Sequence, residues 1–426
     1  MKSYSNYKDS GVKWLGQIPQ HWEVRTLSQL STEHYISNKE VHHQNLLSLS
    51  YGRIVQKNIN TTSGLLPASY DTYQIIEDGN IVLRLTDLQN DQKSLRVGLC
   101  TQEGIITSAY LAIAPRECVI PHYLYLALHT MDLFKMFYSM GNGIRQNLSW
   151  KELHKSSLPL PPLSEQLSIV SYLDVKVSAM DRLVLLTQQK VEHLKALKQA
   201  IIQQTVTTGI PNKNHILKQT NIKWIKQIPQ HWEEIRLGRL FTENKKVNSD
   251  LACMEAYKFN YGSLVRKDLG IDPKELQDTY SKYTVLKDRD IVINGLNLNY
   301  DFVSVRVAQA LQKGVITSAY LVLEPRKNIC DKYYCWLLKA MDYMKLFHGM
   351  GSGIRLTLSY KDLKNQLLPL PPLSEQEEIV AYLDEKTAKI DLLIDKELQQ
   401  IDHIKDLKQT LIADVVTGKV DVTTKR

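Results

Sequence analysis

The sequence predicts an α+β protein: two duplicated domains of mixed α/β structure, joined by two long antiparallel helices that form a coiled-coil spacer with a pseudo-twofold arrangement. Three observations predict this fold. The chain repeats itself at a constant offset, the first part of each copy mixes strand and helix patterns, and the second part carries a long apolar stripe of helical period.

The internal repeat is visible in short phrases. "IPQHW" occurs at 18–22 and 228–232, and "LPLPPLSEQ" begins at Leu158 and again at Leu368, so the offset is 210 residues in both cases. A constant offset means that almost no insertion or deletion separates the copies. A unit of this length is too long for a solenoid repeat. Two copies suggest a pseudo-twofold molecule that meets a partner with two similar faces.

The first part of each copy mixes strands with a few helices. "YQIIEDGNIVLRL" and "SLRVGLCTQEGIITSAYLAIAP" place β-branched and aromatic residues between Gly and Asp turns, which is typical of strand–turn–strand segments. "PHYLYLALHTMDLFKMFYSM" opens with Pro121 and spaces its apolar residues three and four apart, so it predicts a helix.

The phrase "LPLPPLSEQ" predicts a stiff extended segment followed by the start of a helix. Its three prolines fix φ and favour an extended chain. Ser164 and Ser374 occupy the expected N-cap position. Glu165 and Glu375 lie in the expected first turn, where a carboxylate interacts favourably with the helix dipole.

The helix after each phrase has apolar residues at steps of three and four, which is the coiled-coil signature. The stripe residues are Leu173, Val177, Met180, Val184, Val191 and Leu194 in the first helix, and Leu383, Ile390, Ile394, Ile401 and Ile404 in the second. Lys198 and Lys408 are among the interruptions, and Gly209 and Gly418 are the expected stops. At 1.5 Å per residue the first helix spans about 65 Å. We expect the helices to pack on each other, antiparallel if the copies obey a twofold; the alternative is that each packs on its own domain.

Composition excludes several classes of protein. No segment has the run of about 20 apolar residues that a membrane span needs, and the polar start "MKSYSNYKDSGVKW" lacks the apolar core of a secretory signal. The five cysteines match no zinc spacing and are predicted to be free thiols in a reducing cytoplasm. The twelve histidines are scattered, and the isolated pair His42 and His43 fits a surface better than a metal site, so no metal site is predicted.

The net charge of +8 is unevenly distributed. Residues 213–368 hold 25 Lys and Arg against 16 Asp and Glu, whereas residues 369–426 hold 8 against 12. A basic segment of this kind fits a nucleic-acid surface, and a solvated surface rich in lysine explains it equally well.

The order of these parts resembles the specificity (S) subunit of type I restriction–modification enzymes, and the likeness covers the whole chain. It is carried by the paired "PLPPLSEQ" phrases, the paired "GNGIR" and "GSGIR" segments, and "IPQHW" at the start of each domain. The resemblance implies target-recognition domains at 1–157 and 213–367. It implies conserved spacer regions, each a long helix, at 158–212 and 368–426.

The resemblance also implies a function in phage defence. In this family each recognition domain reads one half of a bipartite DNA site, while the helices set the spacer and dock two methyltransferase (M) subunits. Two restriction/motor (R) subunits join for cleavage. No cofactor is implied for this chain, since S-adenosylmethionine, Mg and ATP are expected on the partner subunits. The implied location is the cytoplasm of a bacterium or archaeon, in association with the nucleoid.

Missing motifs favour a role without catalysis. The sequence has no GxxxxGK[ST] phosphate loop, no "NPPY" or "DPPY" motif of adenine methyltransferases, and no GxGxxG after a strand. Two alternatives stay open. One is a non-DNA adaptor that binds two protein partners through its duplicated domains, and the other is a DNA enzyme with an unrecognised active site.

The duplication separates candidate phosphate contacts from candidate base contacts. Phosphate contacts position a protein on DNA and base contacts specify the sequence, so shared basic residues favour phosphate and divergent polar residues favour bases. Arg145 and Arg355 follow glycine-flanked segments, where backbone approaches a phosphate closely. The shared phosphate candidates are Arg145 with Arg355, Lys57 with Lys267, and Arg96 with Arg306.

The divergent candidates centre on the loop "RLTDLQND" (84–91) and its counterpart "NGLNLNYD" (294–301). Arg favours guanine O6 and N7, and Asn or Gln favours adenine N6 and N7. Drift on a solvated loop is the competing explanation. The candidates for base readout are Arg53, Arg84, Asp87, Gln89, Gln146, Asn294, Asn297 and Asn299.

Overall fold

The structure is a computed structural model that describes residues 2–40, 42–59, 69–91, 94–140, 147–211, 213, 215–267, 273–326, 328–354 and 356–423. The chain divides into two compact units: unit 1 is Met1–Thr187 with Gln399–Arg426, and unit 2 is Gln188–Leu398. Two long helices, α4 (Leu163–Thr208) and α9 (Leu373–Val416), each give one part to unit 1 and the other part to unit 2. The domain boundaries implied by the resemblance remain a prediction.

Unit 1 is built from short strands and a few helices beside its parts of the long helices. Its strands are β1 (Tyr7–Asp9), β2 (Gln17–Pro19), β3 (Glu23–Thr26), β4 (Ser31–His34), β5 (Ile36–Ser37), β6 (Leu47–Ser50), β7 (Arg53–Gln56), β8 (Tyr73–Ile76), β9 (Ile81–Leu83), β10 (Val97–Leu99), β11 (Gly104–Thr107), β12 (Leu111–Pro115) and β13 (Ser157–Leu160). Its shorter helices are α1 (Leu27–Leu30), α2 (Pro121–Leu133), the 3₁₀ helix η1 (Met136–Ser139) and α3 (Trp150–Leu153).

The central sheet of unit 1 is antiparallel, with strand order β10-β9-β12-β4. Strand β9 is buried on both faces: Ile81 and Leu83 belong to the main core, whereas Val82 belongs to a smaller core on the other face. Side chains alternate across a strand, so burial of both faces requires the uninterrupted apolar run "IVL".

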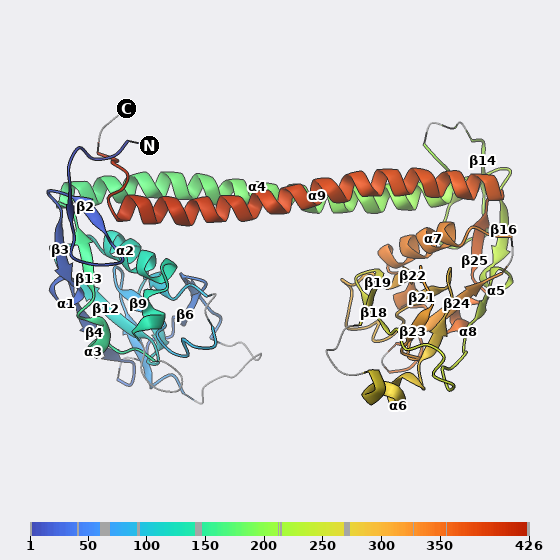
Figure 1. Cartoon of the computed structure of the whole chain (residues 1–426), viewed down its shortest axis with the longest axis horizontal. Helices are drawn as coiled ribbons and strands as arrows, with labels where there is room; N and C mark the ends of the chain where they lie inside the picture. Colours follow the sequence, from blue (N-terminus) through green and yellow to red (C-terminus); the bar gives the residue numbers. More distant parts are fainter. Residues whose placement is uncertain are drawn as a thin grey trace. The chain divides into compact units, whose positions relative to one another are not determined.

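The main core of unit 1 joins distant parts of the chain. Residues of α2 such as Tyr123 and Leu128 share this core with Leu173 of α4 and with Leu411 and Val415 of α9. Figure 1 shows α2, in teal, between the strands of this unit and the long helices. The C-terminal residues are therefore part of the core of the first domain.

Unit 2 repeats this construction. Its strands are β14 (Leu217–Gln219), β15 (Gln227–Pro229), β16 (Glu233–Arg236), β17 (Phe241–Glu243), β18 (Tyr257–Asn260), β19 (Ser263–Arg266), β20 (Thr284–Leu286), β21 (Ile291–Ile293), β22 (Val307–Gln309), β23 (Gly314–Ile316), β24 (Leu321–Pro325) and β25 (Leu367–Leu370). Its shorter helices are α5 (Leu237–Leu240), η2 (Pro273–Leu276), α6 (Gln277–Tyr280), α7 (Asp331–Tyr343), η3 (Leu346–Gly349) and α8 (Tyr360–Leu363).

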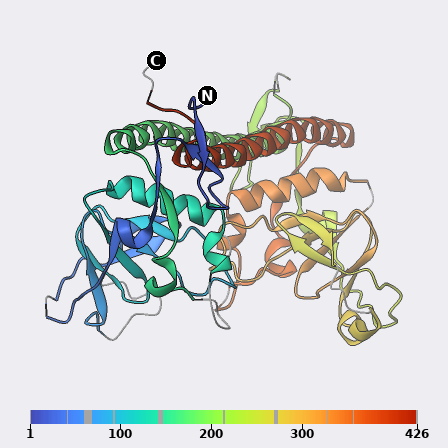
Figure 2. The ribbon, with the colours of Figure 1, turned by 60° about the vertical axis from the view of Figure 1, so that its left-hand side comes forward.

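The sheet and core of unit 2 match those of unit 1. Its central sheet has the order β17-β24-β21-β22, and Ile291 and Ile293 of β21 lie in the main core. The same core contains Val206 of α4 together with Ile379 and Leu383 of α9. Figure 2 shows α7, in orange, crossing this unit between its strands and the long helices. The predicted α+β fold with two duplicated mixed domains is confirmed.

Ion pairs fix the relative direction of the two long helices within each unit. In unit 2, Lys190 Nζ lies 2.7 Å from Glu397 Oε1 and Lys198 Nζ lies 2.6 Å from Asp391 Oδ2, so residue numbers rise on α4 as they fall on α9. In unit 1, Lys408 Nζ lies 2.6 Å from Asp181 Oδ1. The helices therefore pair antiparallel, as predicted. Lys198 and Lys408 interrupt the apolar stripes because they form these pairs.

The predicted coiled-coil stripe is turned inward. Leu173, Val191, Leu383, Ile390, Ile401 and Ile404 are buried, and Val177, Met180, Val184, Leu194 and Ile394 are half-buried. Both helices end at glycines with positive φ, +84° at Gly209 and +78° at Gly418, a conformation that glycine adopts without strain.

The helix starts differ from the prediction by two residues. Helix α4 begins at Leu163 and α9 at Leu373, so Ser164 and Ser374 lie inside the first turn and are not N-caps. The reason is that the carbonyl of Pro162 already accepts hydrogen bonds from the N–H groups of Glu165 (2.9 Å) and Gln166 (3.0 Å). The prolines thus lead directly into the helix.

A buried glutamine explains why "LPLPPLSEQ" recurs. Gln166 Nε2 donates to the Pro161 carbonyl (2.9 Å), and its Oε1 accepts from the N–H of Ile120, the residue before α2, at 2.8 Å. Gln376 makes the same bonds in unit 2, to the Pro371 carbonyl at 2.9 Å and from the N–H of Cys330 at 3.0 Å. One side chain therefore ties the start of a long helix to the start of the helix beneath it.

Two predictions from composition, on the cysteines and on membrane spans, can be compared with the structure. All five cysteines are free. Among the described residues, none of the helices combines the length and the apolar character needed to cross a membrane.

Asp290 is a buried carboxylate that occurs only in unit 2. It accepts hydrogen bonds from the N–H of Lys287 and from Asn244 Nδ2, both at 2.9 Å, and burial raises its pKa from 3.8 to about 6. The folded protein therefore binds a proton here more tightly than the unfolded chain does. The resulting stability is complete below about pH 4 and is lost as pH rises through about 6. The matching residue of unit 1 is Asn80, whose Oδ1 accepts from the N–H of Glu77 at 2.9 Å.

We predict that Asp290→Asn is more stable than the wild type, with a gap that widens by about 1 kcal/mol between pH 5 and pH 8. Urea unfolding at several pH values measures this gap. The reverse change, Asn80→Asp, is the matched control and should lower stability with the same pH direction. A gap that stays constant with pH contradicts the assignment.

Candidate nucleic-acid interface

The two loops in which the copies diverge occupy equivalent places in the two units. Loop 84–91 follows β9 and leads toward β10, and loop 294–301 follows β21 and leads toward β22. Each loop therefore leaves a strand that is buried on both faces, which gives it a rigid base.

A buried arginine holds the backbone of loop 84–91. Arg96 is fully buried, and its Nη1 donates to the carbonyls of Arg84 (3.1 Å) and Thr86 (3.0 Å). Its Nη2 donates to the carbonyl of Asp91, and its Nε donates to the Tyr138 hydroxyl at 2.9 Å. The path of this loop is thus set by one side chain from the following strand segment.

Arg306 holds loop 294–301 in the same way. Its Nη1 donates to the carbonyls of Asn294 (3.0 Å) and Leu296 (2.8 Å), and its Nη2 donates to the carbonyl of Asp301 (2.8 Å). Both units therefore carry the same frame: a buried arginine whose guanidinium is surrounded by loop carbonyls.

This placement argues against the predicted phosphate contacts of Arg96 and Arg306. Their exposed fractions are 0% and 1%, and their Nη groups donate to loop carbonyl oxygens, so they offer no surface to a phosphate. Both copies have these arginines because each one holds the backbone of its loop by hydrogen bonds.

A buried aspartate connects each frame to a helix. Asp132 Oδ2 of α2 accepts a hydrogen bond from the backbone N–H of Arg96 at 2.6 Å, and Asp342 Oδ2 of α7 accepts from that of Arg306 at 2.7 Å. Burial raises the pKa of both carboxyls. The helices therefore position the arginines, and the arginines position the loops.

Loop 84–91 presents polar groups that are partly engaged with one another. Arg84 Nη1 lies 3.9 Å from Asp91 Oδ2, a loose ion pair. Asp87 has a φ of +55°, and its N–H donates to Asn147 Oδ1 at 2.9 Å. Gln89 is exposed. Three predicted base-readout candidates, Arg84, Asp87 and Gln89, thus lie on one loop.

Loop 294–301 presents a different surface. Asn297 is exposed with a φ of +51°, at the position equivalent to Asp87. Asn294 is half-buried and its Oδ1 accepts from the N–H of Leu296 at 3.2 Å, while Asn299 Nδ2 donates to the carbonyl of Ile354 at 3.4 Å. Of these three predicted candidates, Asn297 is the most open to a ligand.

Exposed apolar side chains beside loop 294–301 were missed in the sequence. Tyr300 is 75% exposed, Val303 85% and Ile354 96%. Phe302 is 55% exposed and stacks on His348 with ring centroids 4.6 Å apart. The signal that points to them is the run "NYDFV", two aromatic residues and a valine in an otherwise polar loop.

The remaining predicted contacts fall into two groups. Arg53 lies on β7 with its Nη2 3.0 Å from Asp181 Oδ2 of α4, so it is already paired. Lys57 is exposed and Lys267 is half-buried. Arg145, Gln146 and Arg355 lie outside the described residues, and their predicted roles stay predictions.

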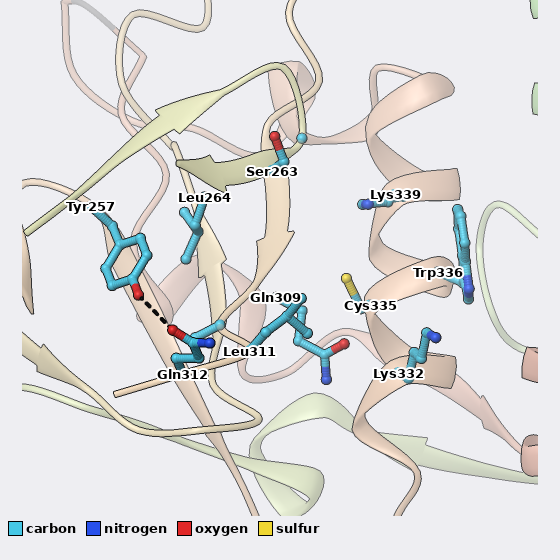
Figure 3. A pocket seen from close by; sticks show the side chains of 12 residues that line it. Tyr257, Ser263, Leu264, Gln309, Leu311, Gln312, Lys332, Cys335, Trp336 and Lys339 are labelled. Atoms are coloured by element: carbon cyan, nitrogen blue, oxygen red, sulfur yellow. Dashed lines mark hydrogen bonds between the residues drawn. The ribbon is translucent and has the colours of Figure 1, made fainter. Parts of the chain in front are cut away.

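A pocket of about 400 Å³ opens in unit 2 between the β18–β19 hairpin and α7 (Figure 3). Ser263, the counterpart of Arg53, lies at its edge, and Lys332 and Lys339 of α7 line the opposite wall. In unit 1 the corresponding pocket contains Arg53 and His129. Arg53 and Ser263, which differ between the copies, thus each line a pocket in their own unit.

Comparison with known proteins fits the duplicated frame. The family model described as "Type I restriction modification DNA specificity domain" matches residues 229–403. The chain is 24% identical over 443 residues to the putative type I restriction enzyme MjaX specificity subunit of Methanocaldococcus jannaschii, covering 98% of both proteins. These likenesses confirm the predicted resemblance to the specificity subunits of type I restriction–modification enzymes.

Other comparisons agree with this resemblance. The specificity subunit of type I restriction enzyme EcoBI from Escherichia coli is 24% identical over 294 residues, which span 65% of this chain and 60% of that relative's length. A solved chain described by the words "complex assembly and conformational transition of the type I R-M system" has a TM-score of 0.67 and 16% identity, covering 95% of this chain and 99% of that one. The latter likeness concerns the fold.

We predict that Arg306→Met lowers the stability of the subunit by about 3 kcal/mol or more, because three loop carbonyls lose their charged donor. Urea unfolding monitored by circular dichroism measures the loss. Arg84→Met, which removes only a loose surface pair, is the matched control and should cost at most about 0.5 kcal/mol. Equal stability of Arg306→Met and wild type contradicts the role of the buried frame.

Proposed function

We propose that this chain is the DNA-reading subunit of a type I restriction–modification complex, and that each unit reads one half of a bipartite DNA site. One observation carries the proposal: the buried residues that hold the loop are the same in both units, whereas the side chains on the surface of the loop differ. Both units hold a loop by a buried arginine and a buried aspartate, yet the side chains on the two loops differ.

This pattern is what sequence reading requires. A reader of bases needs side chains held at fixed positions against the groove, and a change of base needs a change of side chain only. Asp87 of unit 1 and Asn297 of unit 2 illustrate the point, since both have a positive φ and a different side chain. An aspartate accepts a hydrogen bond from cytosine N4, whereas an asparagine pairs with adenine N6 and N7.

The exposed apolar residues fit the same surface. Tyr300 and Val303 follow the exposed Asn297 in the sequence, and Ile354 accepts a hydrogen bond from Asn299 of the same loop. Apolar side chains contact the methyl group of thymine in the major groove. We assign unit 2 a half-site that contains A·T pairs.

The long helices set the spacer and dock two methyltransferase subunits in this proposal, and two restriction/motor subunits join for cleavage. Exposed leucines of the long helices recur in both copies: Leu163 (49%) with Leu373 (44%), Leu183 (44%) with Leu393 (46%), and Leu197 (50%) with Leu407 (46%). Exposed leucines at equivalent positions of a duplicated chain support docking of two equivalent protein partners.

The subunit has no catalytic role in this proposal. S-adenosylmethionine, Mg and ATP are bound by the partner subunits, and the complex acts in the cytoplasm at the nucleoid.

A loop exchange tests the reading function. When residues 84–91 are replaced by the sequence of 294–301, we predict that one half of the methylated motif changes while the other half and the spacer length stay the same. Adenine methylation is mapped genome-wide after co-expression with the methyltransferase.

The reverse exchange, 294–301 replaced by the sequence of 84–91, is the matched control and should change the other half only. Circular dichroism verifies that both variants fold. An unchanged motif in both variants removes these loops from base reading, and a chain that binds the methyltransferase but directs no sequence-specific methylation favours the adaptor alternative.

The docking surface has its own test. We predict that Leu183→Glu combined with Leu393→Glu lowers co-purification of the methyltransferase at least tenfold, because a carboxylate is placed in an apolar contact. Leu186→Glu is the matched control, since Leu186 is 51% exposed but its counterpart in the second copy is Lys396. Equal loss in the control contradicts docking through the shared leucines.

A further inference from the structure

Three donor groups from distant parts of the sequence meet in unit 2. They are the imidazoles of His215 and His231 and the carboxylate of Glu375, and one ligand atom from each lies within 4.8 Å of the others. His215 lies between the end of α4 and β14, His231 belongs to "IPQHW", and Glu375 lies in the first turn of α9. The cluster is therefore a junction between the second domain and both long helices.

Two atoms of this cluster are buried without a partner. Neither His215 Nε2 nor Glu375 Oε1 has a hydrogen-bond partner, and they lie 3.6 Å apart, within the range of an ion pair but too far apart for a hydrogen bond. Unsatisfied buried polar atoms are rare because each costs free energy. Here two of them face each other.

The other oxygen of the carboxylate is fully used. Glu375 Oε2 accepts from Trp232 Nε1 at 3.0 Å and lies 2.8 Å from His231 Nε2. Oε1 is thus the oxygen available to a ligand, while the indole N–H keeps the carboxylate oriented. A hydrogen bond of this kind is the usual support for a metal-binding side chain.

Unit 1 shows what the same carboxylate does without the second histidine. Glu165 keeps the partners His21 Nε2 (2.8 Å) and Trp22 Nε1 (3.0 Å), but the position of His215 is taken by Ser5. The hydroxyl of Tyr4 donates to Glu165 Oε1 instead. That carboxylate is satisfied by protein groups alone. In the second copy the residue aligned with Tyr4 is Asn214, and the residue aligned with Ser5 is the metal-ligand side chain of His215.

We propose that His215 Nε2, His231 Nε2 and Glu375 Oε1 bind one Zn²⁺ ion in unit 2, with water in the fourth position. Two imidazole nitrogens and a carboxylate oxygen are a zinc ligand set. Ligands at about 2.1 Å from a tetrahedral ion lie about 3.4 Å apart, which is near the 3.6 Å separation of His215 and Glu375. His231 Nε2 completes the site by exchanging its 2.8 Å contact with Glu375 Oε2 for the ion.

The surroundings leave room for the ion. Gly209 ends α4 beside the site, and a Cβ at this residue would lie 3.1 Å from His215 Nε2 and 3.3 Å from Glu375 Oε1. Any other residue would crowd the cluster. The side chain of His231 is 48% exposed, so the ion has a path from solvent. Zinc in this place is structural: it fastens the chain leaving α4 to the first turn of α9.

Zinc titration of the purified full-length chain tests the proposal. After treatment with EDTA, the chain is titrated with Zn²⁺ in competition with a chromogenic chelator, and its thermal unfolding is recorded with and without the ion. We expect one tight equivalent per chain and a rise in the unfolding temperature, since an ion that binds only the folded state stabilises it. Co²⁺ in place of Zn²⁺ should give visible absorption bands.

Matched variants separate this site from other histidines. His215→Ser, which copies the residue of unit 1, should weaken zinc affinity at least tenfold and abolish the thermal shift, and Glu375→Gln should do the same. His21→Gln, a change at the unit 1 counterpart of His231, should leave affinity unchanged. Because His215 is replaced by its natural counterpart, that variant keeps the test valid if Glu375→Gln fails to fold. No zinc binding, or equal affinity in wild type and His215→Ser, identifies the cluster as a plain ion pair and overturns the proposal.

Discussion

The buried Glu–Gln pair at the start of each long helix is the interaction on which both units depend. The glutamate is hydrogen-bonded to the indole N–H and to the imidazole of "IPQHW". The glutamine accepts a hydrogen bond from the backbone N–H of the residue that precedes α2 or α7. These bonds fix three elements against one another: the entry of the domain, its main helix and the long helix. Buried polar groups of this kind are costly unless all are satisfied, so the residue types at these positions are tightly constrained. The near-identical phrases of the two copies follow from this constraint.

The candidate DNA-reading surface is built outward from the same helices. Asp132 and Asp342 hold the backbone of a buried arginine, and each arginine holds a loop. The conformation of the loop is thus stabilised by residues that do not face solvent. Exposed side chains on the loop are left free to differ between the two copies. The same separation explains why a shared arginine need not be a DNA contact.

Much of the fold could be predicted from the sequence. The offset of 210 residues, the apolar stripes and the prolines of "LPLPPLSEQ" indicate the two domains and the paired helices, because these features act locally or at fixed spacing. The site was harder to predict. Arginine is a common phosphate ligand, and the sequence does not show that Arg96 and Arg306 are buried beneath loop carbonyls. Glu375 lies 144 residues after His231 in the sequence. The spacing of His215, His231 and Glu375 therefore matches no metal-binding motif, and the sequence does not predict the cluster. The N-cap prediction missed by two residues, because the carbonyl of Pro162 already accepts the first hydrogen bonds of the helix.

The central claim is that the duplicated chain directs methylation to a bipartite DNA sequence. The most direct measurement is a genome-wide map of adenine methylation from the methyltransferase encoded beside this chain, recorded with and without the chain. The account predicts two half-sites separated by a spacer of fixed length, with methylation lost when the chain is omitted. Methylation that is independent of the chain, or that shows no bipartite motif from an assembled complex, would contradict it.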